Sequence, residues 1–152
     1  MGRLPMWIRF VLYGLLGWCV EVVWTAVSAR LRGRERDPRL LGHTSLWMFP
    51  LYGLLAPLYE PLHDFLRPWH WFMRGALYVL GIWLVEYVSG WLLRRLTGKC
   101  PWDYTHLRGN LHGLIAWEYA PLWFVFGLAL EPVHDALVQL TPSLERILNA
   151  AG

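Results

Sequence analysis

Charge is scarce in this sequence. Charged residues make up 16% of the 152 positions, and hydrophobic residues make up 56%. An ordinary soluble domain carries about 25% charged residues. The composition excludes a disordered chain, a coiled coil and a typical soluble enzyme. It favours a membrane protein, with no nucleic-acid partner.

Cysteines and nucleotide motifs are also scarce. Cys19 and Cys100 are too few for a disulfide framework, so they do not decide the redox compartment. There is no Walker loop, no nucleotide fingerprint and no Gly-x-Ser-x-Gly elbow. Direct ATP use is therefore unsupported. The six histidines show no metal-ligand spacing, so the sequence predicts neither a metal site nor a cofactor, and a catalytic residue stays unknown.

Apolar stretches, by contrast, are long. Four of them are each near the length that crosses about 30 Å of hydrocarbon as a helix: Trp7–Ala29, Leu46–His63, Trp71–Leu93 and Gly113–Glu131. The first is too long for a signal peptide and contains Glu21. A fifth stretch, Val133–Leu148, carries several polar residues and predicts an amphipathic helix lying along the membrane interface.

The basic residues are distributed unevenly between the two sides. Nine of the 14 fall in the two long loops, residues 30–45 and 94–111. The positive-inside rule therefore predicts that both loops are cytoplasmic, with both termini outside. The predicted location is a multi-pass membrane protein, in the inner or plasma membrane if the source is bacterial.

The sequence also repeats itself. Residues 12–23 align with 77–88 at an offset of 65, and Glu60-Pro-Leu-His-Asp aligns with Glu131-Pro-Val-His-Asp at an offset of 71. Chance similarity between Leu- and Trp-rich helices is the alternative. The repeat predicts an all-α integral membrane fold, in which four transmembrane helices form two tandem helical hairpins. The whole chain, 1–152, is then one membrane domain: repeat one is about 7–66, repeat two about 71–137, and the amphipathic tail 133–148.

Each predicted span carries a glutamate, and ionisable groups in hydrocarbon are costly and usually functional. Glu21, Glu86 and Glu118 fall at one depth, on the cytoplasmic side of the midplane, if the spans are centred as predicted. Glu60 and Glu131 fall near the opposite surface. Glu21 and Glu86 are related by the repeat, whereas Glu118 has no counterpart and is the stronger candidate for chemistry. The alternative is that these carboxylates only hold helices together.

Other candidate residues lie near these carboxylates or in the second loop. Trp18 and Tyr52 are expected to line the path beside the carboxylates. In the loop, Trp102 and Tyr104 are expected at the lipid headgroups, and Asp103 is expected to cap a turn or pair with an arginine. Asn110 belongs to the same loop motif. Arg108 is a candidate phosphate ligand, although basic loops beside a span are often only topology signals.

Several motifs together resemble a known family. They are Gly17-Trp18-x-x-Glu21, Gly42-His-Thr-Ser-x-Trp47, Leu51-Tyr-Gly53, Trp83-x-x-Glu86, Cys100-Pro-Trp-Asp-Tyr104 and Gly113-Leu-Ile-x-x-Glu118-Tyr119. The chain resembles the transmembrane protein 229 family and the bacterial CmpB-type putative ABC-transporter permeases over residues 10–130. Residues 40–45 depart from the bacterial pattern. The resemblance implies a small multi-span membrane protein of poorly defined activity.

Three functions stay open on these observations. The favoured one is a small transporter or channel component whose carboxylates bind a cation or a proton. The second is a non-catalytic assembly or regulatory subunit. The third is a membrane-embedded enzyme or binder of lipid headgroups, with Glu118 or Asp103 as general base. Membrane lipids are the expected partners, and a homodimer or a larger membrane complex is compatible with the size.

Overall fold

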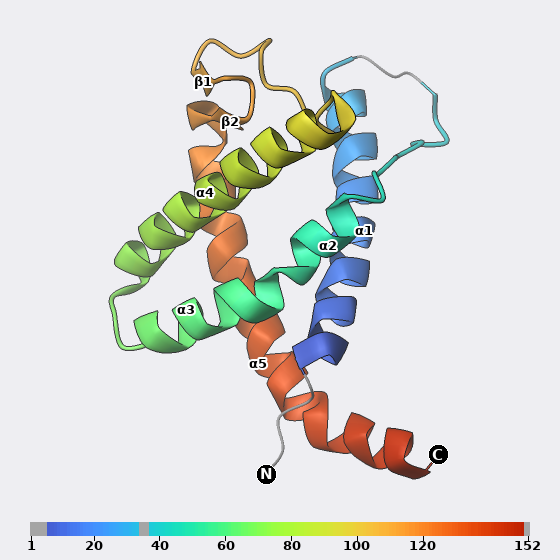
Figure 1. Ribbon diagram of the computed structural model, residues 1–152, viewed down its shortest axis with the longest axis vertical. Coiled ribbons are helices and arrows are strands. Elements are labelled where there is room, and N and C mark those ends of the chain that lie inside the picture. The colour runs from blue at the N-terminus through green and yellow to red at the C-terminus, as the bar shows by residue number, and fades with distance from the viewer. Residues whose placement is uncertain (1–5, 34–36, 151–152) are drawn as a thin grey trace. The chain divides into compact units, whose positions relative to one another are not determined.

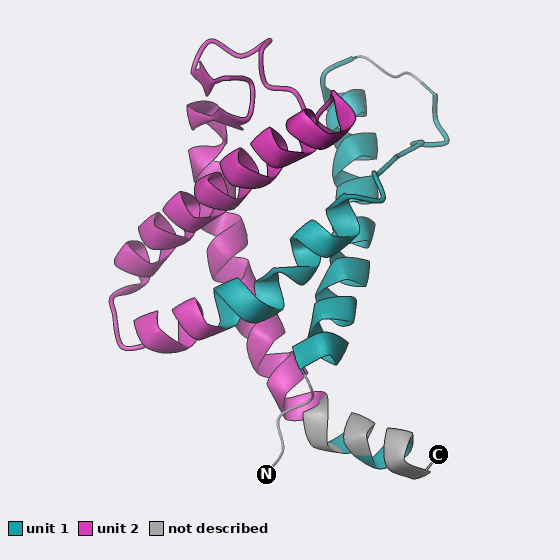
Figure 2. Ribbon diagram, in the orientation of Figure 1, with its two compact units in different colours: residues 1–60, 141–152 teal, residues 61–140 magenta. Residues whose placement is uncertain are grey.

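The computed structural model describes residues 6–33 and 37–150, and these form two compact units (Figure 2). Unit 1 comprises residues 1–60 and 141–152, and unit 2 comprises residues 61–140. Arg3, Arg34 and Arg36, which entered the charge count, lie outside the described residues. Almost all of the described secondary structure is helical, as the sequence predicts (Figure 1).

Unit 1 is built on helix α1, Met6–Leu31, with helix α2, Met48–Gly53, packed against it (Figure 1). The buried face of α1 includes Tyr13, Gly14 and Gly17. The two glycines face α2, because a β-carbon on Gly14 would lie 2.8 Å from the Phe49 ring and one on Gly17 would lie 2.0 Å from Tyr52. The two glycines thus allow a close approach of the two helices.

The expected second span, Leu46–His63, is not one continuous α-helix. It is divided into α2, a π-helical turn η1 at Leu55–Tyr59, and α3 at Glu60–Leu66. Pro57 lies in η1 and Pro61 near the start of α3. A proline removes a backbone donor and clashes with the preceding turn, so the prolines account for the interruption.

Unit 2 contains helix α4, Trp71–Thr97, which begins and ends with clear caps. The side chain of His70 accepts a hydrogen bond from the backbone N–H of Phe72, and Gly98 ends the helix with a φ of 78°. A left-handed residue at this position is the common way for a helix to stop. A loop then leads to a short antiparallel pair, β1 at Asn110–Leu111 and β2 at Ile115–Ala116.

The predicted fourth span is displaced along the chain. Residues 113–116 belong to the turn and to β2, a 3-10 turn η2 covers Trp117–Tyr119, and helix α5 runs from Ala120 to Ala150. Pro121 lies in the first turn of α5, where its missing N–H costs nothing. Residues 133–148 continue α5 and do not form a separate helix, and that they lie along the membrane interface stays a prediction.

Three helical segments of the described chain are long and apolar enough to cross a membrane: Met6–Leu31, Trp71–Thr97 and Trp117–Leu140. The protein is therefore an integral multi-pass membrane protein. The expected span Leu46–His63 is helical but interrupted, and that it crosses the membrane as a fourth span stays a prediction. The sidedness of the loops stays a prediction.

Candidate carboxylate sites and buried ion pairs

Glu21 and Tyr52 form a direct contact in unit 1. The Tyr52 hydroxyl donates a hydrogen bond of 2.7 Å to a Glu21 carboxylate oxygen. Tyr52 reaches this position because it lies over Gly17, one helical turn before Glu21 on the same face of α1. Glu21 and Tyr52 are therefore in direct contact, and that they line an ion site stays a prediction.

Trp18 lies next to this pair along α1. Its indole N–H donates to the backbone carbonyl of Ser45 at 3.0 Å, and its ring packs against Phe49 with centroids 5.0 Å apart. Thr25, further along the helix, donates to the carbonyl of His43 and accepts from the His43 N–H. These bonds fix residues 43–45 against α1, so Trp18 has a positioning role in the structure.

Glu86 in unit 2 also accepts a hydrogen bond from a tyrosine. The donor is the Tyr104 hydroxyl, at 3.0 Å from Glu86 Oε1. The sequence places Tyr104 at the headgroups, whereas the structure directs its hydroxyl to the α4 carboxylate. The Tyr104 ring also packs on Tyr119, with centroids 5.2 Å apart.

The rest of the loop motif holds the loop in shape. Trp102 donates from its indole N–H to the Leu114 carbonyl at 2.9 Å. Asp103 accepts from the Thr105 N–H at 2.9 Å, and hydrogen bonds from Thr105 hold the pKa of this exposed carboxyl below its ordinary value. Asn110 accepts from the Gly113 N–H at 2.8 Å, where Gly113 has a φ of 69°. Asp103 thus caps a turn within the loop by accepting the Thr105 N–H.

Glu118 and Arg108 are both exposed. Glu118 belongs to η2, at the beginning of the candidate span Trp117–Leu140. The sequence places Glu118 inside a span at Gly113–Glu131, whereas the candidate span in the structure is Trp117–Leu140, with Glu118 at its start. A function for Glu118, and phosphate binding by Arg108, stay predictions.

Two further glutamates, Glu60 and Glu131, pair with arginines. In unit 1, Arg9 Nε lies 2.9 Å from both carboxylate oxygens of Glu60, and both side chains are less than 10% exposed. In unit 2, Arg74 bonds Glu131 through Nε at 2.8 Å and through Nη2 at 2.9 Å. Such ion pairs satisfy each carboxylate with an internal cation.

A histidine cluster adjoins the second ion pair. His63 Nδ1 lies 2.8 Å from the Tyr78 hydroxyl, which lies 3.1 Å from Glu131 Oε1. Arg67 Nη2 lies 2.9 Å from His63 Nε2. Burial, with the positive charge of Arg67, lowers the pKa of His63 below its ordinary value. His134 packs edge-on against His63, with ring centroids 5.2 Å apart.

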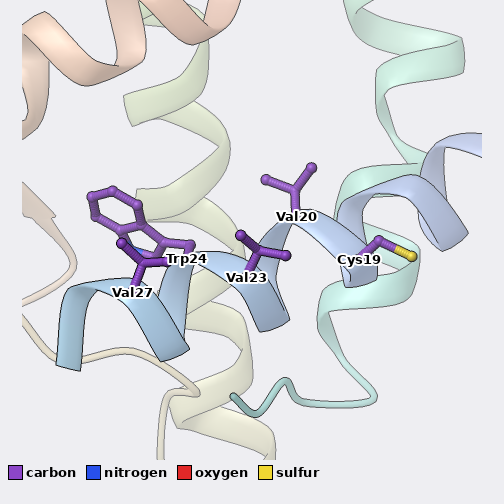
Figure 3. Close-up of a pocket in the computed structure, with 5 residues that line it drawn as sticks. All are labelled: Cys19, Val20, Val23, Trp24 and Val27. Carbon is purple, nitrogen blue, oxygen red and sulfur yellow. The ribbon is translucent and has the colours of Figure 1, made fainter. Parts of the chain in front are cut away.

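One apolar hollow lies on a face of α1 (Figure 3). Its lining residues are Cys19, Val20, Val23, Trp24 and Val27. All of them come from a single helix and none carries a charge, so the hollow offers no polar chemistry. It suits contact with hydrocarbon chains.

A comparison with protein families gives one match. The model of the family described as "Putative ABC-transporter type IV" (ABC_trans_CmpB) matches residues 8–150. The match covers most of the chain, including every candidate residue described above. No solved structure matches the chain.

Proposed function

We propose, from the premise that this chain belongs to the putative ABC-transporter type IV family, that it is a transport component whose intramembrane carboxylates bind a cation or a proton. Glu21 and Glu86 are the carboxylates in this proposal. Tyr52 and Tyr104 position them. The proposal treats the site in each unit separately.

The observation that carries the proposal is the contrast between two kinds of glutamate. Glu60 is paired with Arg9, so binding another cation there would mean breaking a buried ion pair. Glu21 instead accepts a neutral tyrosine hydroxyl, and no ion pair with it is found in the described part of the chain. A carboxylate held in this way has no ion pair that a mobile ion would need to break. Glu21 lies on the apolar span Met6–Leu31, where an ionisable group favours a functional role.

The sequence repeat gives further support. Glu86 lies 65 positions after Glu21, and Arg74 and Glu131 lie 65 and 71 positions after Arg9 and Glu60. The ion pairs thus occur at corresponding positions of the two proposed repeats. Tyr104 is not the counterpart of Tyr52, so the tyrosine donors come from different elements. We propose a parallel-repeat arrangement, as in transporters related by an axis along the membrane normal.

The test is charge movement in reconstituted liposomes. Wild-type protein on a solid-supported membrane should give a transient current on a concentration jump of H⁺, Na⁺ or K⁺. Glu21→Gln and Glu86→Gln should abolish it, because each removes the ion-binding charge at nearly constant volume. Tyr52→Phe should change the half-saturating concentration by about tenfold, since a hydrogen bond to a charged group is worth roughly 1.5–3 kcal/mol.

One control variant and one negative outcome make the test specific. Glu118→Gln changes an exposed carboxylate at the start of a span, and the proposal predicts a retained current. Loss of current in Glu118→Gln alone would instead support the site favoured by sequence. Wild-type protein that gives no current with any of the three ions would overturn the proposal and favour an assembly subunit.

The lipid-headgroup enzyme is less well supported by the geometry. A general base works best with a pKa near the operating pH. The hydrogen bonds from Thr105 move the pKa of Asp103 in the opposite direction. A lipid-modifying activity that survives Asp103→Asn would be consistent with this, and one that is lost would revive the enzyme hypothesis.

A further inference from the structure

We infer that His63, His134 and Asp135, with Asp64 beside them, form a binding site for a divalent transition-metal ion such as Zn²⁺. The site lies within unit 2, between α3 and α5. It uses neither Glu21 nor Glu86, so it does not rest on the proposed function.

The donor atoms already lie close together. One ligand atom from each of His63, His134 and Asp135 falls within 4.8 Å of the other two, and both histidines are buried. His134 Nε2 lies 3.5 Å from Asp64 Oδ1, which offers a fourth ligand. Donors of a tetrahedral zinc site are about 3.3 Å apart, given Zn–N and Zn–O bonds of about 2.0–2.2 Å. Small side-chain rotations would bring these ligand atoms to the spacing of a tetrahedral site.

The hydrogen bonds of His63 prepare one ring nitrogen for a cation. Arginine can only donate, so the contact with Arg67 makes Nε2 of His63 an acceptor and places the ring proton on Nδ1. The Nδ1–H then donates to the Tyr78 hydroxyl, which donates to Glu131. A ligating histidine typically donates its second N–H to such a partner, which fixes its tautomer.

The Arg67 guanidinium already places a positive charge against the proposed metal ligands. Its Nη2 contacts both His63 Nε2 and Asp135 Oδ1, two of the candidate donor atoms. The Arg67 side chain is 52% exposed, so it can leave without disturbing a packed core. A divalent ion would replace the guanidinium against the same donors. Arg67 is therefore a built-in competitor for the metal.

The repeat explains how residues so far apart supply one donor set. His63-Asp64 and His134-Asp135 are the ends of the two Glu-Pro-x-His-Asp motifs, 71 positions apart. Imidazole and carboxylate donors together suit Zn²⁺, Co²⁺ or Mn²⁺ rather than Ca²⁺ or Mg²⁺. An ion pair with Arg67 needs only one carboxylate, that of Asp135. The cluster also contains His63, Asp64 and His134, which a metal ion could use as ligands.

The experiment is metal titration of the full-length protein in detergent, purified without a histidine tag and stripped of metal. Co²⁺ binding is followed by its visible absorption, and Zn²⁺ is then added in competition. Wild type should bind one ion per chain. His134→Gln and Asp135→Asn should weaken binding by more than about tenfold, by loss of a ligand. His106→Gln, at an exposed loop histidine, is the matched control and should bind like wild type.

Arg67→Gln decides between a metal site and an ion-pair cluster. It should tighten binding on the order of tenfold, because it removes a competing positive charge. It should also give a larger rise in thermal midpoint on Zn²⁺ addition than wild type. Unchanged or weaker binding in folded Arg67→Gln would overturn the proposal, even if the histidine variants fail to fold. Wild type that binds neither Co²⁺ nor Zn²⁺ would also overturn it.

Discussion

The glutamates of this protein differ in the partner that each carboxylate has. Glu60 and Arg9 neutralise one another in a buried pair, whereas Glu21 is held by a tyrosine hydroxyl. Both are glutamates in apolar stretches of the sequence, and neither local motif shows which one pairs with an arginine. The difference comes from tertiary contacts. Arg9 and Glu60 are 51 positions apart in the sequence, and Glu21 and Tyr52 are 31 positions apart.

Removing one partner of the buried ion pair should be costly. Arg9→Met leaves the Glu60 carboxylate buried without its cation, and we expect the free energy of unfolding to fall by about 3 kcal/mol. Unfolding by SDS titration, followed by circular dichroism, measures the change. The double variant Arg9→Met, Glu60→Gln should lose clearly less. A single variant as stable as wild type would show that the pair contributes little.

Cys100 gives a prediction about pH. Burial raises the pKa of its thiol, so the reactive thiolate is rarer in the folded protein than in an ordinary cysteine. In a Cys19→Ser background, maleimide labelling should be slower for folded than for SDS-unfolded protein near pH 7. The folded rate should still be rising with pH above about 8.5, the ordinary thiol value. Equal rates in the two states would contradict this.

At the scale of elements, the close contact between α1 and α2 depends on Gly17. A β-carbon there would lie 2.0 Å from Tyr52 Cγ, so Tyr52 would have to move away from Glu21. We expect Gly17→Ala to cost about 1–3 kcal/mol of stability and to reduce ion current as Tyr52→Phe does. Thermal unfolding and the current assay measure the two effects.

The matched control is Gly81→Ala. A β-carbon at Gly81 would meet only Leu62 Cδ2, at 3.8 Å, which is ordinary contact. This variant should be as stable and as active as wild type. If Gly17→Ala behaves in the same way, the contact that positions Tyr52 is not as close as described.

The long apolar helices were predictable from sequence, because a continuous apolar stretch is enough to identify them. Hydropathy predicts α1 and α4 to within a few residues. Hydropathy alone does not show that Pro57 and Pro61 interrupt the helix at Leu46–His63. It also began the last span too early, since residues 113–116, which form a turn and strand β2, are apolar as well.

The candidate sites were predictable only in part, for a related reason. The Glu21–Tyr52 contact agrees with the expectation that Tyr52 lies beside the carboxylates. Tyr104 reaches Glu86 through the folding of an irregular loop, which has no period to read. The Arg9–Glu60 and Arg74–Glu131 pairs could have been found by extending the repeat, because both pairs obey its offsets. The same extension pairs His63 with His134, which ligand spacing misses.

At the scale of the whole molecule, the broken segment Met48–Leu66 decides the topology. If it crosses the bilayer, loops 30–45 and 94–111 lie on one side, and the positive-inside rule places them in the cytoplasm. In a chain without native cysteines, Leu41→Cys and His106→Cys should both resist an impermeant maleimide until the cells are permeabilised. Labelling of one site only on intact cells would mean that the segment does not cross. Labelling of both would reverse the orientation.

A homodimer also stays a prediction at this scale. Native mass spectrometry of gently purified protein measures it directly, and the same spectra report retained lipids. A monomer under conditions that preserve lipid binding would contradict the prediction of a dimer.

The central claim is that Glu21 and Glu86 carry the mobile ion. The most direct measurement is the current from liposomes that contain the double variant Glu21→Gln, Glu86→Gln, at the same protein density as wild type. The account predicts a folded protein with no current on any H⁺, Na⁺ or K⁺ jump to which wild type responds. A double variant that still gives the wild-type current would contradict it.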